Sequence, residues 1–225
     1  MIAVAAVLTG GMKRIATFTE KWVPIMAAVY FVGAIVVLLF YRDRITGAID
    51  LIFQGAFHTS SAVGGVAGYS VKQALRMGIA RGIFSNEAGL GSSVMAHAHS
   101  DVDDPQIQGM WGILEVFIDT ILVCTITALV ILVSEVPYQQ TVAMDGTTLT
   151  GMAFESVIPW GKEFLAGATA LFAFATMIGW FYFGSQTADY LAGEKGVKVY
   201  RLCYILITLP GCMSAPTIIW ELSDA

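Results

Sequence analysis

The sequence Arg81-Gly82-Ile83-Phe84-Ser85-Asn86-Glu87-Ala88-Gly89-Leu90-Gly91-Ser92-Ser93 is rich in glycine and polar residues, yet it lies between long apolar segments. Lipid permits non-helical backbone at membrane depth only where protein or a water-filled cavity surrounds it. A helix interrupted here leaves free N–H and C=O groups in a region of low dielectric constant. Such groups suit a small zwitterion and a cation, so the stretch predicts a solute-binding break in a secondary transporter.

The composition of the whole chain indicates a membrane protein. Of its 225 residues, 56% are hydrophobic and 13% are charged, whereas a soluble domain is nearer half apolar and a quarter charged. The net charge of −5 is spread over the chain, and no basic run indicates a nucleic-acid partner. We therefore expect an all-α polytopic protein whose surroundings are the lipid bilayer of the cell (inner or plasma) membrane.

Apolar runs and polar interruptions predict the order of the elements. The expected elements are the end of a span (1–11), a span (23–40), an outer amphipathic helix (45–57), a broken span (69–100), a span (108–133), an outer loop (134–162) and two spans (164–184 and 199–220). Residues 1–11 are too short to cross a core that needs about 20 residues. The chain is therefore expected to be a fragment of one longer transmembrane domain.

Basic residues predict the orientation of these spans. Lys13 and Arg14 lie at one end of the chain and Lys195 and Lys198 near the other, with an even number of predicted spans between them. An even number places both groups on one side, which the positive-inside rule makes the cytoplasm.

Two glycine-rich segments can hold the break of the span over 69–100. Ser85-Asn86-Glu87 is typical of the start of a new half-helix, which favours a break over residues 84–91. Residues 64–68 remain the alternative.

The residues of the favoured break are candidates for binding a substrate. If Ser85 and Asn86 begin a half-helix, its N–H groups can receive a carboxylate, while Phe84 lines the pocket and Gly89 lets the backbone approach a small ligand. An ionised Glu87 inside the bilayer costs about 2.5–3.5 kcal/mol or more unless it is paired. It can bind an ion, bind the substrate amine or brace the break. The alternative for the whole stretch is a tight helix crossing made of small residues.

Two further pairs are candidates because their spacing of four places them on one helix face. Glu115 and Asp119 can carry a proton or hold Na⁺, or they can form a structural network with hydroxyls such as Thr120. Thr176 can offer its hydroxyl to a hard cation and Trp180 can wall a small pocket. Alternatively, Thr176 bonds back to its own helix.

Several longer matches carry a resemblance to a known family. They are Gly11-Met12-Lys13-Arg14-Ile15-Ala16, Val71-Lys72-Gln73-Ala74-Leu75-Arg76-Met77-Gly78-Ile79-Ala80-Arg81, GIFSNEAGLGSS, LEVFIDTILVCTITALVIL from Leu114 and FAFATMIGW from Phe172. With these motifs the chain resembles the sodium:alanine (alanine or glycine:cation) symporter family over nearly its whole length.

The resemblance implies a partial LeuT-type inverted-repeat bundle, from the end of the fourth span through the ninth, in which a discontinuous helix carries the site. It implies symport of alanine or glycine into the cell with Na⁺, or with H⁺, and makes the remaining helices of the full-length transporter a partner. It also makes Thr176 a candidate Na⁺ ligand, although Ala175 stands where the family often has a second hydroxyl.

The leading hypothesis is therefore cation-coupled symport of a small neutral amino acid. The alternatives are another LeuT-type carrier driven by H⁺ and a membrane structural or channel subunit that does not transport. An enzyme is not expected, because the sequence shows no nucleophile–base pair, metal triad or phosphate loop.

Overall fold

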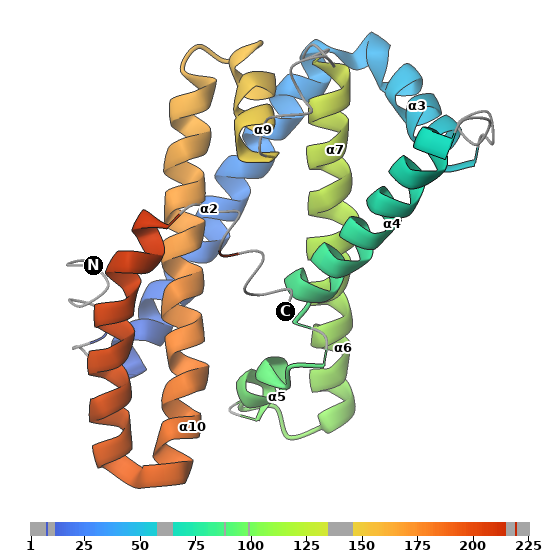
Figure 1. Cartoon of the computed structure of the whole chain (residues 1–225). Helices are drawn as coiled ribbons and strands as arrows, with labels where there is room; N and C mark the ends of the chain where they lie inside the picture. The colour runs from blue at the N-terminus through green and yellow to red at the C-terminus, as the bar shows by residue number, and fades with distance from the viewer. Residues whose placement is uncertain are drawn as a thin grey trace. The chain divides into compact units, whose positions relative to one another are not determined.

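The computed structural model describes residues 8, 12–57, 65–87, 89–98, 100–134, 146–214 and 219, and this part of the chain contains helices and no strand (Figure 1). The elements are α2 (Met12–Phe40), a 3₁₀ turn η1 (Arg42–Arg44), α3 (Ile45–Phe57), α4 (Gly65–Ser85), α5 (Ser92–His97), α6 (Pro105–Val116), a π-helical segment η3 (Phe117–Val123), α7 (Cys124–Val133), α9 (Gly146–Glu155) and α10 (Gly161–Met213).

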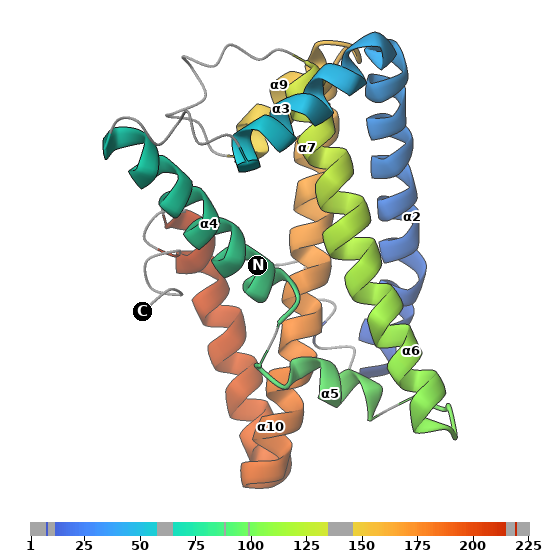
Figure 2. The same ribbon diagram turned by 90° about the vertical axis from the view of Figure 1, so that its right-hand side faces the viewer.

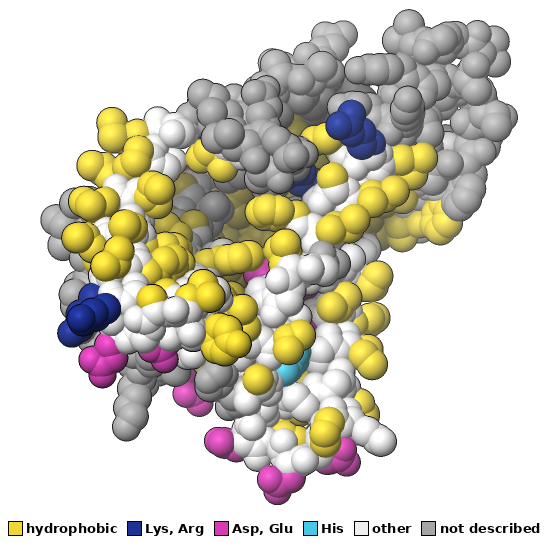
Figure 3. Space-filling model, turned by 60° about the horizontal axis from the view of Figure 1, so that its bottom comes forward, with side chains coloured by type: hydrophobic (Ala, Val, Ile, Leu, Met, Phe, Trp, Pro, Cys, Tyr) yellow, Lys and Arg dark blue, Asp and Glu magenta, His cyan; other side chains and the backbone are white. Residues whose placement is uncertain are grey.

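Three described helices are long and apolar enough to cross a membrane, over Thr19–Phe40, Pro105–Val133 and Gly161–Met213. Hydrophobic side chains are spread over much of the face that Figure 3 shows. Many large ones are exposed, among them Leu39, Ile113 and Ile207 at 66%, 73% and 68%. Such exposure is expected where lipid or further helices, rather than water, surround the chain. The described part of the chain is all-helical, and its three long apolar helices indicate a multi-pass membrane protein.

The chain divides into two compact units, each described here by itself. One comprises Met1–Ala27 with Thr169–Ala225, and the other comprises Ala28–Ala168.

In the second unit, α6, η3 and α7 form one continuous helical rod (Figure 2). The Asp104 side chain caps its start by accepting from the Gln106 N–H at 2.8 Å, and Pro105 occupies a first-turn position that lacks a helical partner anyway. Helices α3 and α9 contact α7, and α4 contacts η3. This rod therefore supports the elements around it.

Several predicted boundaries differ from the structure. Helix α2 begins at Met12, before the predicted start of the first complete span at residue 23, and continues through Pro24. The bounds of the span inside the membrane stay a prediction. Proline is tolerated inside membrane helices where neighbouring groups satisfy the freed carbonyl. α3 covers the same residues as the predicted amphipathic helix, 45–57, and its place on the outer surface stays a prediction. The predicted span end over residues 1–11 lies outside the described residues, apart from Leu8.

The region predicted as an outer loop, residues 134–162, contains the short helix α9, and its place outside the membrane stays a prediction. Phe154 on α9 is fully buried, and its ring lies 5.8 Å from those of both Tyr30 and Phe164. A Cβ at Gly33 would come within 3.0–3.2 Å of the Phe154 and Phe164 rings, so glycine leaves room for this stack. Tertiary burial of one aromatic side chain stabilises a helix that its short, polar sequence does not predict.

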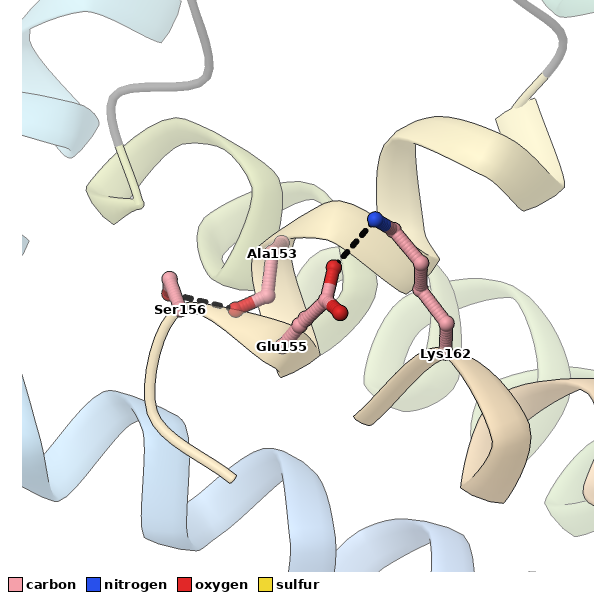
Figure 4. A network of polar contacts seen from close by, with 4 residues as sticks. All are labelled: Ala153, Glu155, Ser156 and Lys162. Atoms are coloured by element: carbon pink, nitrogen blue, oxygen red, sulfur yellow. Dashed lines mark hydrogen bonds and ion pairs between the residues drawn. The ribbon is translucent and has the colours of Figure 1, made fainter. Parts of the chain in front are cut away.

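Polar contacts fix the short link between α9 and α10 (Figure 4). The Ser156 hydroxyl donates to the Ala153 carbonyl at 2.6 Å, which satisfies one of the last carbonyls of α9. Lys162 on α10 forms an ion pair with Glu155, the last residue of α9. A Cβ at Gly161 would overlap the Glu155 backbone, so the chain reverses within a space that only glycine fits.

Helix α10 is a hairpin of two arms joined at Gly193. Its 53 residues, at a rise of about 1.5 Å each, are far too long for one crossing of a core about 30 Å thick. Gly193 has φ 61° and ψ −159°, a backbone region essentially restricted to glycine, and the arms run side by side in both views (Figures 1 and 2). The predicted spans over 164–184 and 199–220 fall in these arms. The residues between them continue the helices, and those after 214, except 219, lie outside the described part.

Aromatic packing holds the two arms together. The Phe181 ring is 5.6 Å from the Tyr200 ring and 5.4 Å from the Tyr204 ring. The Tyr204 hydroxyl donates to the Met177 carbonyl at 2.7 Å. A Cβ at Gly184 would overlap the Tyr200 hydroxyl, so the arms can approach this closely only where glycine stands.

Candidate functional site

The helix interruption lies between α4, which ends at Ser85, and α5, which begins at Ser92. Glu87, Gly89 and Gly91 have φ of 51°, 82° and 76°, the left-handed region that disfavours most residues other than glycine. Residues 65–68, which belong to the alternative break, are helical in α4, and residue 64 lies outside the described part. The described backbone is therefore irregular within the stretch that the sequence favours.

The role predicted for Ser85 and Asn86 in starting a new half-helix is wrong. Ser85 is the last residue of α4. The Asn86 backbone N–H and its Nδ2 both donate to the Gly82 carbonyl, at 3.1 and 2.9 Å. The last carbonyls of a helix lack partners, and an asparagine amide has two donor hydrogens, so Asn86 closes the end of the preceding helix. These two residues therefore do not open a half-helix to a carboxylate.

Side chains at the end of α4 are tied to the π-helical segment η3. The Ser85 hydroxyl donates to Asp119 Oδ2 at 2.6 Å. Asn86 Nδ2 donates to Thr120 Oγ1 at 2.8 Å, and the Thr120 hydroxyl donates to Asn86 Oδ1 at 3.0 Å. We call Ser85, Asn86, Asp119 and Thr120 the break cluster. Asn86, Asp119 and Thr120 are half-buried and Ser85 is exposed, so the cluster joins two helices and reaches the surface of the described structure.

Of the two predicted carboxylates, Asp119 joins the break cluster and lies in the π-helical segment η3. In a π-helix the hydrogen bonds run from i to i+5, so the period lengthens, and such segments often occur at functional sites. Glu115 precedes the segment and is exposed, whereas Asp119 lies inside it and is half-buried. The structure therefore brings Asp119, but not Glu115, to the break. Nothing in the apolar sequence of 117–123 distinguishes it from an ordinary α-helix, so sequence analysis did not predict this segment.

Glu87 finds its partner in the second half of the broken element. Its carboxylate accepts from the hydroxyl of Ser92, a buried residue at the first position of α5. Gln108 on α6 holds the far end of α5, since its side chain lies 2.6 Å from His97 Nδ1 and accepts from the Ser100 hydroxyl at 2.7 Å. Sequence analysis did not single out Ser92, although the serines of the GLGSS segment were the available signal.

The other predicted site residues do not belong to the break cluster. Phe84 is 48% exposed on the last turn of α4. Gly89 is exposed, with no atom within 4 Å of a Cβ built on it. Thr176 and Trp180 are exposed residues of the first arm of α10, in the other unit, where the Trp180 ring lies edge-on to Phe183 at 6.1 Å.

The break cluster is rich in oxygen ligands. It combines one carboxylate, two hydroxyls and one amide oxygen, and hard cations prefer such oxygens. A carboxylate within a candidate membrane span is costly unless it is partnered, and the Ser85 hydroxyl supplies one partner to Asp119. Chemically, this arrangement can hold a monovalent cation or a proton next to an interrupted helix.

Comparisons with known proteins place the chain among transporters. The family model described as the sodium:alanine symporter family matches residues 1–225. An uncharacterized transporter of Haemophilus influenzae is 37% identical over 225 residues, which are 99% of this chain and 49% of that protein. The sodium/alanine symporter AgcS of Methanococcus maripaludis is 35% identical over 224 residues, 99% of this chain and 49% of that protein. The probable sodium/glutamine symporter GlnT of Bacillus subtilis is 35% identical over 227 residues, 100% of this chain and 46% of that protein.

The chain thus spans about half the length of the curated relatives it matches. The family and these relatives are transporters, not enzymes. On the family match over all 225 residues, the chain belongs to the sodium:alanine symporter family.

Proposed function

We propose that this chain forms part of a cation-coupled symporter that carries a small neutral amino acid, such as alanine or glycine, into the cell across the plasma membrane with Na⁺. The observation that carries the proposal is the break cluster, in which the end of an interrupted helix is hydrogen-bonded to a carboxylate on a neighbouring helix. Two relatives named sodium/alanine and probable sodium/glutamine symporters support the choice of ion and substrate class.

In this proposal Asp119 provides the charge that attracts the coupling ion. The Ser85 and Thr120 hydroxyls add neutral oxygen ligands. The Ser85 hydroxyl donates to the Asp119 carboxylate, and when Na⁺ enters it turns its lone pairs toward the ion. Asn86 positions Thr120 through its paired hydrogen bonds. Thr176 remains a candidate for a second Na⁺ ligand.

The substrate occupies the irregular backbone beyond Asn86 in the LeuT-type arrangement that we propose for the complete transporter. Gly89 and Gly91 have positive φ and leave room for a ligand to approach the main chain. Phe84, at the end of α4, remains a candidate for the wall of that pocket, and Trp180 remains a candidate for substrate binding. We assign Glu87 to bracing the break, because its carboxylate already accepts from Ser92.

Uptake by the complete transporter in liposomes tests the role of Asp119. With an inward Na⁺ gradient, wild-type protein is expected to accumulate labelled alanine. Asp119→Asn removes the charge but keeps the shape, and it should lower uptake at limiting Na⁺ at least tenfold, since a charge-assisted contact is worth about 1.5–3 kcal/mol. Saturating Na⁺ should restore part of the rate.

Glu115→Gln is the matched control, because it neutralises an exposed carboxylate only one turn away. We expect it to keep near wild-type Na⁺ dependence. Equal losses in both variants would contradict the assignment to Asp119. Uptake driven by a pH gradient in the absence of Na⁺ would identify H⁺ as the coupling ion, and uptake that needs no cation gradient would overturn symport.

A further inference from the structure

A polar pocket, separate from the break cluster, lies between the two arms of α10, next to their turn at Gly193. Its volume is about 310 Å³, at the lower end of the range for small-ligand pockets. The lining residues come from both arms: Ser185, Gln186, Asp189, Glu194, Val197, Lys198 and Arg201. It belongs wholly to the first compact unit and shares no residue with the break cluster.

Helical periodicity explains why these side chains converge. On the second arm, Glu194, Val197, Lys198 and Arg201 follow one another at spacings of three, one and three residues, which keeps them on one helix face. The turn at Gly193 folds this face toward the end of the first arm. The hairpin therefore gathers charged groups that are up to 12 positions apart in the sequence, from Asp189 to Arg201.

The charges around this pocket balance but do not pair. Asp189 and Glu194 are acidic, Lys198 and Arg201 are basic, and no ion pair joins these four side chains in the described part of the chain. Asp189, Glu194 and Lys198 are exposed and Arg201 is half-buried, and opposite charges that do not touch leave separate negative and positive regions along the open pocket. A ligand with the same pattern of separated charges, in the complementary order, would fit that field.

Arg201 is the lining residue whose hydrogen-bond donors are incompletely used. Its Nε is buried and has no hydrogen-bond partner in the described structure. A buried donor on a charged group is costly when it is unpaired. Guanidinium groups bind carboxylate and phosphate oxygens in pairs, so the Arg201 side chain is suited to an oxyanion in the pocket that it lines.

We propose that the α10 pocket binds a zwitterion that carries an oxyanion and a primary ammonium. Lys198 and Arg201 hold the oxyanion, and Asp189 and Glu194 accept from the ammonium. Two compounds share this chemistry, the phosphoethanolamine headgroup of a membrane lipid and a free amino acid. The lipid is the expected source, because the pocket lies at the end of two helices with exposed apolar residues such as Leu202 and Leu206, at 60% and 61%. Two of the lining side chains, Lys198 and Arg201, are basic, and basic side chains between membrane helices can bind the phosphate of a lipid headgroup.

Titration calorimetry of the purified protein in detergent tests this proposal. The probes are short-chain dihexanoyl phosphatidylethanolamine, phosphatidylcholine and phosphatidylglycerol, together with L-alanine. Phosphatidylcholine keeps both charges but lacks N–H donors, and phosphatidylglycerol lacks the cation. We expect phosphatidylethanolamine to bind about tenfold more tightly than either of the other lipids, the effect of one charge-assisted hydrogen bond.

Variants assign the binding to this pocket. Arg201→Gln should weaken phosphatidylethanolamine binding about tenfold. Asp189→Asn should still bind the phosphate group, but it should no longer bind phosphatidylethanolamine more tightly than phosphatidylcholine. Lys195→Gln is the matched control, because Lys195 is an exposed cation of the same turn that does not line the pocket, and it should bind like wild type. Far-UV circular dichroism checks that each variant is folded.

The same titrations distinguish the two possible ligands, the lipid headgroup and the free amino acid. If L-alanine displaces the lipid and its own binding weakens in Arg201→Gln, the pocket takes the free amino acid. Alanine binding that persists in Arg201→Gln without displacing lipid belongs to another site and supports the lipid. Equal affinity for all three lipids, or phosphatidylethanolamine binding unchanged in both Arg201→Gln and Asp189→Asn, would overturn the proposal.

Discussion

Two helix interruptions in this protein use glycine in similar ways and are stabilised by different forces. At residues 86–91, Gly89 and Gly91 have positive φ, and side chains at the break are hydrogen-bonded to η3 and α5. At Gly193 the chain also has positive φ, but it reverses, and the two arms pack through aromatic rings.

The difference lies in what stabilises each interruption. The α10 arms are held together by apolar contacts, such as Phe181 against Tyr200. At the break over 86–91, polar side chains are instead held by hydrogen bonds to other side chains, and a ligand or ion can replace such partners. A helix interruption in a membrane protein is therefore informative about function when its partners are polar and exchangeable.

The largest expected effect on stability comes from Gly184→Leu, because the new side chain would overlap Tyr200 and separate the α10 arms. We expect the free energy of unfolding in mixed micelles to fall by about 3 kcal/mol, the upper part of the usual range for overpacking. Gly179→Leu is the control, since nothing lies within 4 Å of a Cβ there. Equal losses in both variants would show that arm packing does not hold this turn.

A smaller loss in the free energy of unfolding is expected when the turn at Gly193 is changed. Gly193→Ala places a Cβ on a residue with φ 61° and ψ −159°, which costs about 1–3 kcal/mol. Gly91→Ala is the comparison at the break, where φ 76° and ψ 3° are left-handed helical and the cost is about 1–2 kcal/mol. Unfolding of both variants in mixed micelles measures these two free-energy costs. A greater loss for Gly91→Ala would reverse the ranking of the two interruptions.

The smallest effect on stability, with a large effect on uptake, is expected in the break cluster. A double-mutant cycle of Asn86→Leu and Thr120→Val should give a coupling free energy of about 0.6–1.7 kcal/mol, the range for hydrogen bonds between membrane helices. Alanine uptake should be lost in Asn86→Leu while the protein still inserts into the membrane. Full uptake by this variant, or zero coupling, would show that the hydrogen bonds to Thr120 serve neither packing nor transport.

Much of the fold could be predicted because hydropathy is a local property. The spans follow from apolar length, and the position of the break follows from the glycines and polar residues of the stretch over 81–93. The helix α9 could not be predicted, because its stability comes from burying Phe154 against Tyr30 and Phe164, which are distant in the sequence. The role of Asn86 was also missed, since the same side chain can cap either end of a helix and only its partner distinguishes them.

By itself, the sequence determined that this is a polytopic membrane protein with an irregular, polar interruption near Asn86, since composition and glycine act within a few residues. Only the tertiary structure decided what that interruption contacts. Ser85 and Asn86 meet Asp119 and Thr120 across 34 positions of the chain, and both partners lie in the π-helical segment η3. Hydrogen-bond partners that distant are selected by the packing of whole helices, which a one-dimensional pattern of residues does not contain.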